Sequence, residues 1–140
     1  MRLWHYMLIP YLPHKQLLSQ HRECCALRGN GWGRKHEVVN YVFRNPFYRL
    51  YVYHLRIINE MINRGFKVDG RWQKMNYRGK VLGFVNIEEI PNTLQFKDMT
   101  HCTNINYPEH NDLYLTQCIA NLQNKKVQFY KDWSALRYCM

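Results

Sequence analysis

The apolar residues between Asn45 and Arg64 repeat at three- and four-residue steps, and this repeat constrains the fold more than any other feature of the chain. Its members are Phe47, Leu50, Tyr51, His54, Leu55, Ile58, Met61 and Ile62. Such spacing places side chains on one face of an α-helix, which must then be buried against a partner. Asn45 is the predicted N-cap, Pro46 suits the first helical position, and Gly65 is the predicted stop.

Two weaker patterns predict further helices. One begins near Pro13 and ends around Gly29, and the other starts in YPEHNDLY with Pro108 and Glu109 in its first turn. Their predicted core positions are Leu17, Leu18, His21, Cys24 and Cys25 in the first, and Leu115, Cys118, Ile119 and Leu122 in the second. The stretch 66–106 fits either a short strand or an irregular excursion. The sequence therefore predicts a mainly α fold with about three main helices and irregular loops.

Length, composition and net charge limit the domain organisation and the classes of partner that we expect for this chain. With 140 residues, 46% hydrophobic residues and no internal repeat or linker, residues 1–140 are expected to form one domain. Twenty Lys and Arg against ten Asp and Glu give a net charge of +10, which favours a polyanionic partner, nucleic acid before an anionic membrane surface. A basic protein without such a partner is the alternative. No apolar run could span a bilayer, and MRLWHYMLIPYLP lacks a signal-peptide cleavage site, so we expect a cytoplasmic protein without a membrane.

The five cysteines show no Cys-x-x-Cys spacing. Cys24 and Cys25 are adjacent, so on a helix they point about 100° apart and do not form a ligand pair. We therefore expect free thiols, with neither a disulfide framework nor a metal site.

Glu23 is the single carboxylate before Glu37, in a strongly basic N-terminal region. Among the residues of this region are Arg2, Arg22, Arg28, Arg34, Lys35 and His36. One interpretation is an intrahelical salt bridge, but the residues three and four positions away are Ser19, Gln20, Ala26 and Leu27, none of them cationic. The other is an acid/base carboxylate in a phosphate-binding cleft.

Four short motifs occur in order along the chain: HREC with Glu23, RKH at 34–36, INRGF at 62–66, and YPEHNDLYL from 107. In order and approximate spacing they resemble the phage-type pyrimidine dimer DNA glycosylases with abasic-site lyase activity. The resemblance extends over residues 1–66 and again over about 107–123. It implies a compact, mostly helical domain whose N-terminal segment threads between helices and brings the α-amino group into the active site.

The resemblance also implies a mechanism. The terminal amine attacks C1′ of the damaged nucleotide, displaces the base and forms an imine, and a glutamate then assists the elimination that breaks the strand. By motif position the glutamate is Glu23, and the phosphate-binding arginines are Arg2, Arg22 and Arg28. Gln16 stands where the family has a histidine. No cofactor or metal is implied, and the expected substrate is damaged double-stranded DNA bound by a monomer.

The reactive terminal amine is expected to be that of Met1, because Arg2 is too large for ordinary removal of the initiator methionine. An α-amino group has a pKa of about 7.7 against about 10.4 for lysine, so much more of it is neutral and nucleophilic at pH 7. We therefore expect Met1 to be retained and reactive.

The remaining predicted DNA contacts are Arg34, Lys35 and His36 on the basic face, with Trp32 in the glycine-rich RGNGWG near the opened strand. Trp32 could instead be an anchor for helix packing. Two other functions stay open. The fold could be a DNA-binding module that lost turnover through the changes at Arg2 and Gln16. It could also be an RNA-binding or ribonuclease domain with His21 or His36 as base, although no paired-histidine spacing supports this.

Overall fold

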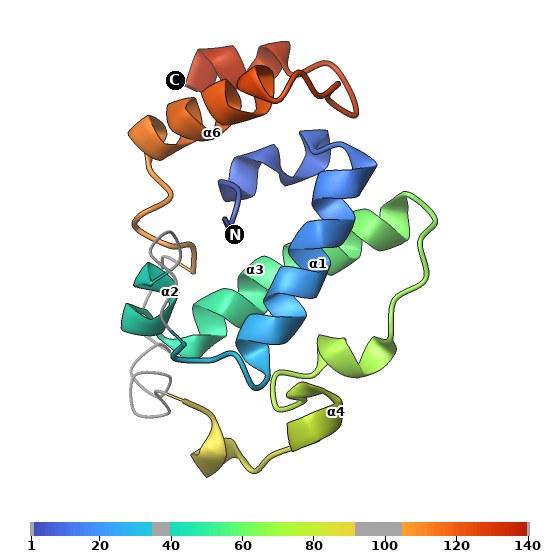
Figure 1. Ribbon diagram of the computed structural model, residues 1–140, viewed down its shortest axis with the longest axis vertical. Coiled ribbons are helices and arrows are strands. Elements are labelled where there is room, and N and C mark those ends of the chain that lie inside the picture. Colours follow the sequence, from blue (N-terminus) through green and yellow to red (C-terminus); the bar gives the residue numbers. More distant parts are fainter. Residues whose placement is uncertain (1, 35–39, 92–104, 140) are drawn as a thin grey trace.

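The computed structural model describes residues 2–34, 40–91 and 105–139. Three main helices dominate: α1 (His14–Arg28), α3 (Phe47–Asn63) and α6 (Asp112–Asn124). Between them lie the shorter elements η1 (Tyr6–Tyr11), α2 (Tyr41–Arg44), η2 (Gly70–Gln73), α4 (Gly79–Leu82), η3 (Ile87–Glu89) and η5 (Ser134–Cys139). α1 and α3 cross each other, α6 lies apart from them, and the N-terminal segment runs between α6 and this pair (Figure 1). The predicted mainly α fold with a threaded N-terminal segment is confirmed.

α1 follows Pro13 and ends before Gly29, as predicted, but the face that it buries differs from the prediction. Its buried residues are Leu17, Gln20, Cys24, Leu27 and Arg28. Gln20 was not among the predicted core positions, and Arg28 was expected to bind phosphate. Both are buried because their side chains hydrogen-bond to main-chain groups of neighbouring segments. Leu18, His21 and Cys25 are half-buried.

α3 begins at Phe47 and closes where predicted. Gly65 adopts φ +90°, a conformation open to glycine, and its N–H donates to the Ile62 carbonyl at 2.9 Å. The predicted N-cap was wrong: the Asn45 side chain donates to the Tyr41 carbonyl at 2.7 Å instead of capping α3. The buried face is also rotated from the predicted one. It includes Tyr53 and Ile57, whereas Ile62 is 49% exposed.

α6 begins later than the sequence suggested. Asn111 is its N-cap, and the Asn111 side chain accepts from the N–H of Tyr114 at 2.9 Å. Pro108 and Glu109 therefore precede the helix instead of forming its first turn. The predicted core positions are confirmed, since Leu115, Cys118, Ile119 and Leu122 are all buried.

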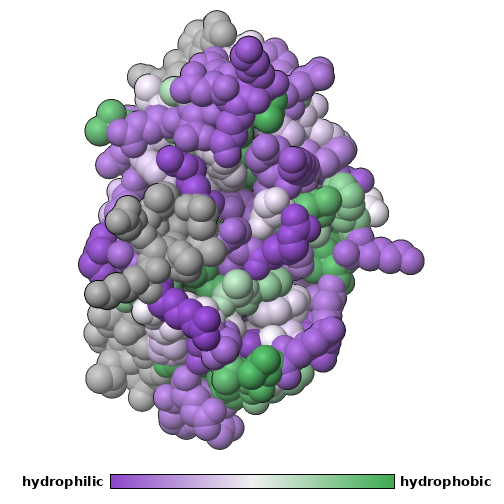
Figure 2. Space-filling model, viewed as in Figure 1, coloured by the Kyte–Doolittle hydropathy of each residue, from purple (hydrophilic) through white to green (hydrophobic). Residues whose placement is uncertain are grey.

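The chain between α3 and residue 91 is irregular. Within the described residues it contains one isolated antiparallel bridge, between Tyr77 and Phe84, and no strand. The remainder of the predicted 66–106 stretch, residues 92–104, lies outside the described residues. Val81, Phe84 and Ile87 expose 80%, 52% and 54% of their surface here. Elsewhere the face seen in Figure 2 is mainly hydrophilic, with smaller hydrophobic patches.

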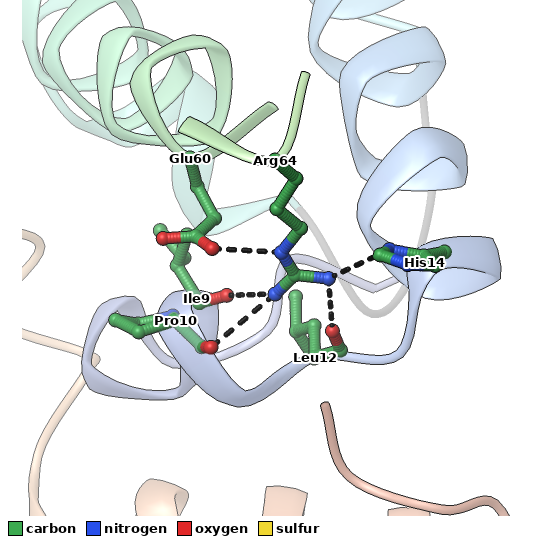
Figure 3. Close-up of polar contacts among 6 residues, drawn as sticks. All are labelled: Ile9, Pro10, Leu12, His14, Glu60 and Arg64. Atoms are coloured by element: carbon green, nitrogen blue, oxygen red, sulfur yellow. Dashed lines mark hydrogen bonds and ion pairs between the residues drawn. The ribbon is translucent and has the colours of Figure 1, made fainter. Parts of the chain in front are cut away.

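Arg64 ties η1 to the end of α3 (Figure 3). Its side chain is fully buried and its Nε donates to Glu60 at 2.7 Å. The terminal nitrogens donate to the backbone carbonyls of Ile9, Pro10 and Leu12 at 3.4, 3.3 and 2.7 Å. Because one guanidinium satisfies three carbonyls of η1 and the segment after it, the path of the N-terminal segment is fixed relative to α3.

Candidate active site

The first described residues of the chain are bound by a side chain of α1. Gln20 Oε1 accepts from the Trp4 N–H at 2.8 Å, and Gln20 Nε2 donates to the Arg2 carbonyl at 2.6 Å. One amide thus pairs with both a donor and an acceptor of the extended main chain. This pairing explains why a glutamine lies in the buried face of α1, since an extended segment inside a protein must have its main-chain groups satisfied.

Two tyrosines hold the same segment from α3 and α6. The Tyr53 hydroxyl lies 2.6 Å from the Trp4 carbonyl and 2.7 Å from Gln20 Oε1, and the Tyr114 hydroxyl donates to the Leu3 carbonyl. Burial raises the pKa of Tyr53 well above its usual value, so this hydroxyl keeps its proton and remains a donor. All three main helices therefore contact the N-terminal segment.

His110 supports the segment from another side. The Tyr6 N–H donates to His110 Nδ1 at 3.2 Å, which places the ring proton on Nε2, 2.8 Å from the Tyr41 hydroxyl. Burial is the main cause that lowers the pKa of His110 to about 3, so the ring is neutral at physiological pH.

A cavity of about 580 Å³ opens where this segment meets α1 and the end of α6. Its described lining residues are Arg2, Trp4, Lys15, Gln16, Ser19, Gln20, Glu23, Asn121, Lys125 and Val127. Three of these side chains are cationic and one is a carboxylate. The guanidinium of Arg2 and the ammonium of Lys125 lie 5.7 and 5.6 Å from the centre of the Trp4 ring. The cavity can therefore receive an anionic ligand beside a single acid/base group.

Glu23 is half-buried and shares this face of α1 with Gln16 and Gln20. Two further side-chain oxygens belong to residues that line the cavity. Gln16 Oε1 and Asn121 Oδ1 are buried and accept no hydrogen bond from the described protein atoms. Buried amide oxygens normally have donors, so these two are unsatisfied acceptors on residues that line the cavity.

The structure brings Arg2, Gln16 and Glu23 together, as three of the predicted site residues. Arg22 is exposed beside them, and its Nη2 donates to Ser19, which lines the cavity, at 3.2 Å. Arg34 is exposed after the glycine-rich turn. Met1, Lys35 and His36 lie outside the described residues.

Arg28 is placed elsewhere, on the opposite face of α1. It is fully buried and donates to the carbonyls of Trp72 and Lys74, each at 2.8 Å. Its guanidinium lies 5.1 and 5.0 Å from the ring centres of Tyr51 and Trp72. Burial lowers the pKa of Arg28 to about 10, which still leaves it charged at neutral pH. These contacts give Arg28 a structural role, and we leave it out of the DNA contacts proposed below.

Trp32 does not line the cavity. Its ring is half-buried and packs edge-on against Phe43, with centroids 5.0 Å apart, and tilted against Phe47 at 5.1 Å. The packing interpretation, which joins the glycine-rich turn to α2 and α3, accounts for this residue.

Sequence reasoning missed Lys15, Gln20, Asn121 and Lys125 as cavity residues. A signal was present for Gln20, because Gln16, Gln20 and Glu23 recur at helical spacing and predict one polar face of α1. No comparable signal pointed to Asn121 and Lys125, which reach the cavity only through the packing of α6 on the N-terminal segment.

The family model for pyrimidine dimer DNA glycosylase matches residues 1–74, which is more than half of the chain. The match includes η1, α1 and α3 and stops before α6. No curated protein and no solved structure matches the chain. No helix among the described residues is long and apolar enough to cross a membrane.

Proposed function

Because the chain belongs to the pyrimidine dimer DNA glycosylase family, we propose that it removes a damaged base from double-stranded DNA and then cleaves the strand at the abasic site. Family membership makes the chain a DNA repair glycosylase, an enzyme that acts on damaged DNA. The lyase step, its nucleophile and the role of Glu23 are the parts that we add. The cavity described above supports them.

The observation that carries the proposal is the position of Glu23. It lies in a cavity with three cationic side chains, next to an N-terminal segment held by three helices. The cations suit the phosphates that flank a lesion, and the carboxylate suits a reaction that needs proton transfer and stabilisation of positive charge. A half-buried glutamate that only paired with a surface cation would explain neither the cavity nor the buried segment.

We assign the nucleophile to the α-amino group of Met1. Arg2, its covalent neighbour, lines the cavity with Glu23, although Met1 itself lies outside the described residues. At pH 7 roughly one sixth of an α-amino group of ordinary pKa is neutral, compared with well under a thousandth of a lysine side chain. The neutral amine attacks C1′ of the damaged nucleotide, and the base leaves with the electrons of the glycosidic bond. The nitrogen loses one proton to the departing base. The C1′–O4′ bond of the sugar then opens, and O4′ takes the second proton as the C=N bond of the imine forms.

Glu23 serves both steps. As the base departs, its carboxylate stabilises the positive charge that develops on the sugar. The imine then makes the C2′ proton acidic, and Glu23 removes this proton while the bond from C3′ to its phosphate oxygen breaks. The strand is cut by β-elimination, and water releases the sugar from the amine.

Binding of the duplex is assigned to the cations around the cavity. Arg2, Lys15 and Lys125 line the cavity. Arg22 and Arg34, two other predicted DNA contacts, are exposed. Their phosphate contacts would set the affinity and its salt dependence. The damaged nucleotide must be unstacked to reach the cavity, whose lining includes the amide side chains of Gln16 and Asn121.

Borohydride trapping tests the proposal. The protein is incubated with a duplex that contains one pyrimidine dimer, with a duplex that contains one abasic site, and with an undamaged duplex. A reduced covalent adduct and strand cleavage are expected with the first two and not with the third. Salt-sensitive binding without adduct or cleavage would show a DNA-binding module and overturn the catalytic proposal. An adduct with abasic DNA alone would restrict the activity to the lyase step.

A further inference from the structure

On the other face of α1, three potential metal ligands converge away from the cavity. His21 and Cys25 lie one turn apart on α1, and His54 comes from α3. His21 Nδ1 lies 2.9 Å from His54 Nε2, and Cys25 Sγ lies 3.9 Å from each of these nitrogens. Nothing in the proposed base-excision chemistry uses these groups.

We propose that His21, Cys25 and His54 form a binding site for one thiophilic transition-metal ion, of which Zn²⁺ is the representative. In a tetrahedral zinc site the bonds are about 2.0 Å to nitrogen and 2.3 Å to sulfur, so the two nitrogens lie about 3.3 Å apart and each lies about 3.5 Å from the sulfur. The observed triangle differs from this arrangement by roughly 0.4 Å on each side. Small side-chain rotations would close that difference.

The chemistry of the donors selects the class of ion. Two imidazole nitrogens and a thiolate suit zinc, cobalt and copper, whereas calcium and magnesium require oxygen ligands. Burial lowers the pKa of both histidines, which keeps the rings neutral as ligation requires. His54 is buried, but His21 and Cys25 are half-buried, so an ion can enter from their side.

The hydrogen bonds of the metal-free site define the protons that must move. Arg28 Nη1 donates to His54 Nδ1 at 2.9 Å, so the proton of the neutral ring sits on Nε2 and is donated to His21 Nδ1. Metal binding shifts the His54 proton from Nε2 to Nδ1, which then faces the Arg28 Nη1 donor. Arg28 Nη1 must therefore move away from the ring and donate to the Trp72 carbonyl alone, which it already contacts at 2.8 Å.

The remaining change is the loss of the Cys25 proton. Burial raises the pKa of the Cys25 thiol to about 12, so the thiol is protonated in the metal-free protein. One thiol proton is therefore released for each metal ion that binds. The thiolate also offsets one of the two charges of the ion beside the cationic Arg28, and for this reason Cys25 is expected to matter more for affinity than His21.

Cobalt titration of the untagged full chain tests the site, because a cobalt–thiolate bond gives a charge-transfer band in the near ultraviolet. We expect this band at one equivalent of Co²⁺, its loss on addition of Zn²⁺, and release of one proton per ion by calorimetry in two buffers. Cys25→Ser should abolish the band. His21→Ala should weaken cobalt binding by more than about tenfold, the lower end of the cost of losing a group that supports a metal.

Cys24→Ala is the matched control, because Cys24 is the neighbouring residue of α1 but is buried in the core outside the cluster. This variant should keep the band, and circular dichroism of each metal-free variant confirms its fold. Absence of the band in the unchanged protein would overturn the site. So would a band that persists in folded Cys25→Ser, which would place the bound cobalt on another cysteine.

Discussion

The two faces of α1 carry polar side chains in comparable number but use them differently. One face presents Gln16, Gln20 and Glu23 to a cavity and to an extended main-chain segment. The other presents His21, Cys25 and Arg28 to α3 and to the irregular chain after it. The first face lines a cavity, whereas on the second the guanidinium of Arg28 is bound by protein carbonyls.

Two arginines, one on each side of this comparison, have different surroundings. Arg2 is half-buried at the cavity, with its charge beside the Trp4 ring, while Arg28 is fully buried among carbonyls and aromatic rings. Both were expected to bind phosphate. The position of a cation in the sequence does not decide between the two roles, because the role depends on which main-chain carbonyls the tertiary fold brings to it.

The largest expected effect is the loss of stability on removing the Arg28 guanidinium. Arg28→Met removes a fully buried guanidinium and leaves the carbonyls of Trp72 and Lys74 without their donor, which should lower the free energy of unfolding by about 3 kcal/mol or more. Urea denaturation measures this. Arg22→Met, on the exposed side of the same helix, should change it by less than about 0.5 kcal/mol. An equal loss of unfolding free energy in Arg28→Met and Arg22→Met would contradict the structural role assigned to Arg28.

The next effect concerns catalysis on the cavity face. Glu23→Gln keeps the size of the side chain but removes the acid/base group, so single-turnover strand cleavage should slow by at least about 100-fold, or roughly 2.7 kcal/mol. Affinity for damaged duplex, measured by fluorescence anisotropy, should stay within a few-fold. Undiminished cleavage would refute the role of Glu23, and an equal loss of binding would make it a binding residue.

A third effect appears with pH, because the fold buries a neutral histidine, His110, against the N-terminal segment. The pKa of His110 is about 3 in the folded protein and about 6.5 in an unfolded chain, so only the unfolded chain gains a proton between these values. The unfolding free energy should therefore fall with decreasing pH in this window, by about 1.4 kcal/mol per unit from His110. His110→Asn, whose Oδ1 can still accept from the Tyr6 N–H, should reduce the slope by that amount. An unchanged slope would mean that His110 does not resist protonation.

The smallest effect is on the salt dependence of DNA binding. Lys125→Met removes a cation from the cavity, so the slope of log affinity against log salt should become shallower by about 0.9, with a few-fold weaker binding. Lys126→Met is the matched control, since Lys126 is exposed and does not line the cavity. A larger change of slope in Lys126→Met than in Lys125→Met would indicate that the phosphate contact lies outside the cavity.

Sequence patterns predicted the three main helices because apolar periodicity and proline or glycine signals are local. The resemblance carried by the motifs assigned Arg2 and Glu23 to one site, and both residues line the same cavity. They failed where a side chain serves the main chain of a distant segment. Gln20 and Arg28 are buried by such pairings, and Asn45 bonds to Tyr41 instead of capping α3. The cluster of Cys25 with His54 was missed because 29 residues separate the two side chains along the chain.

The most direct test is to locate the sugar on the protein after borohydride trapping. Protein expressed to begin at Met1 is trapped on abasic duplex, digested with nuclease, and fragmented intact in a mass spectrometer. The reduced sugar is predicted on the α-amino nitrogen of Met1. Lys15 and Lys125 also bring amines to the cavity, so a sugar on either lysine would contradict the assignment of the nucleophile.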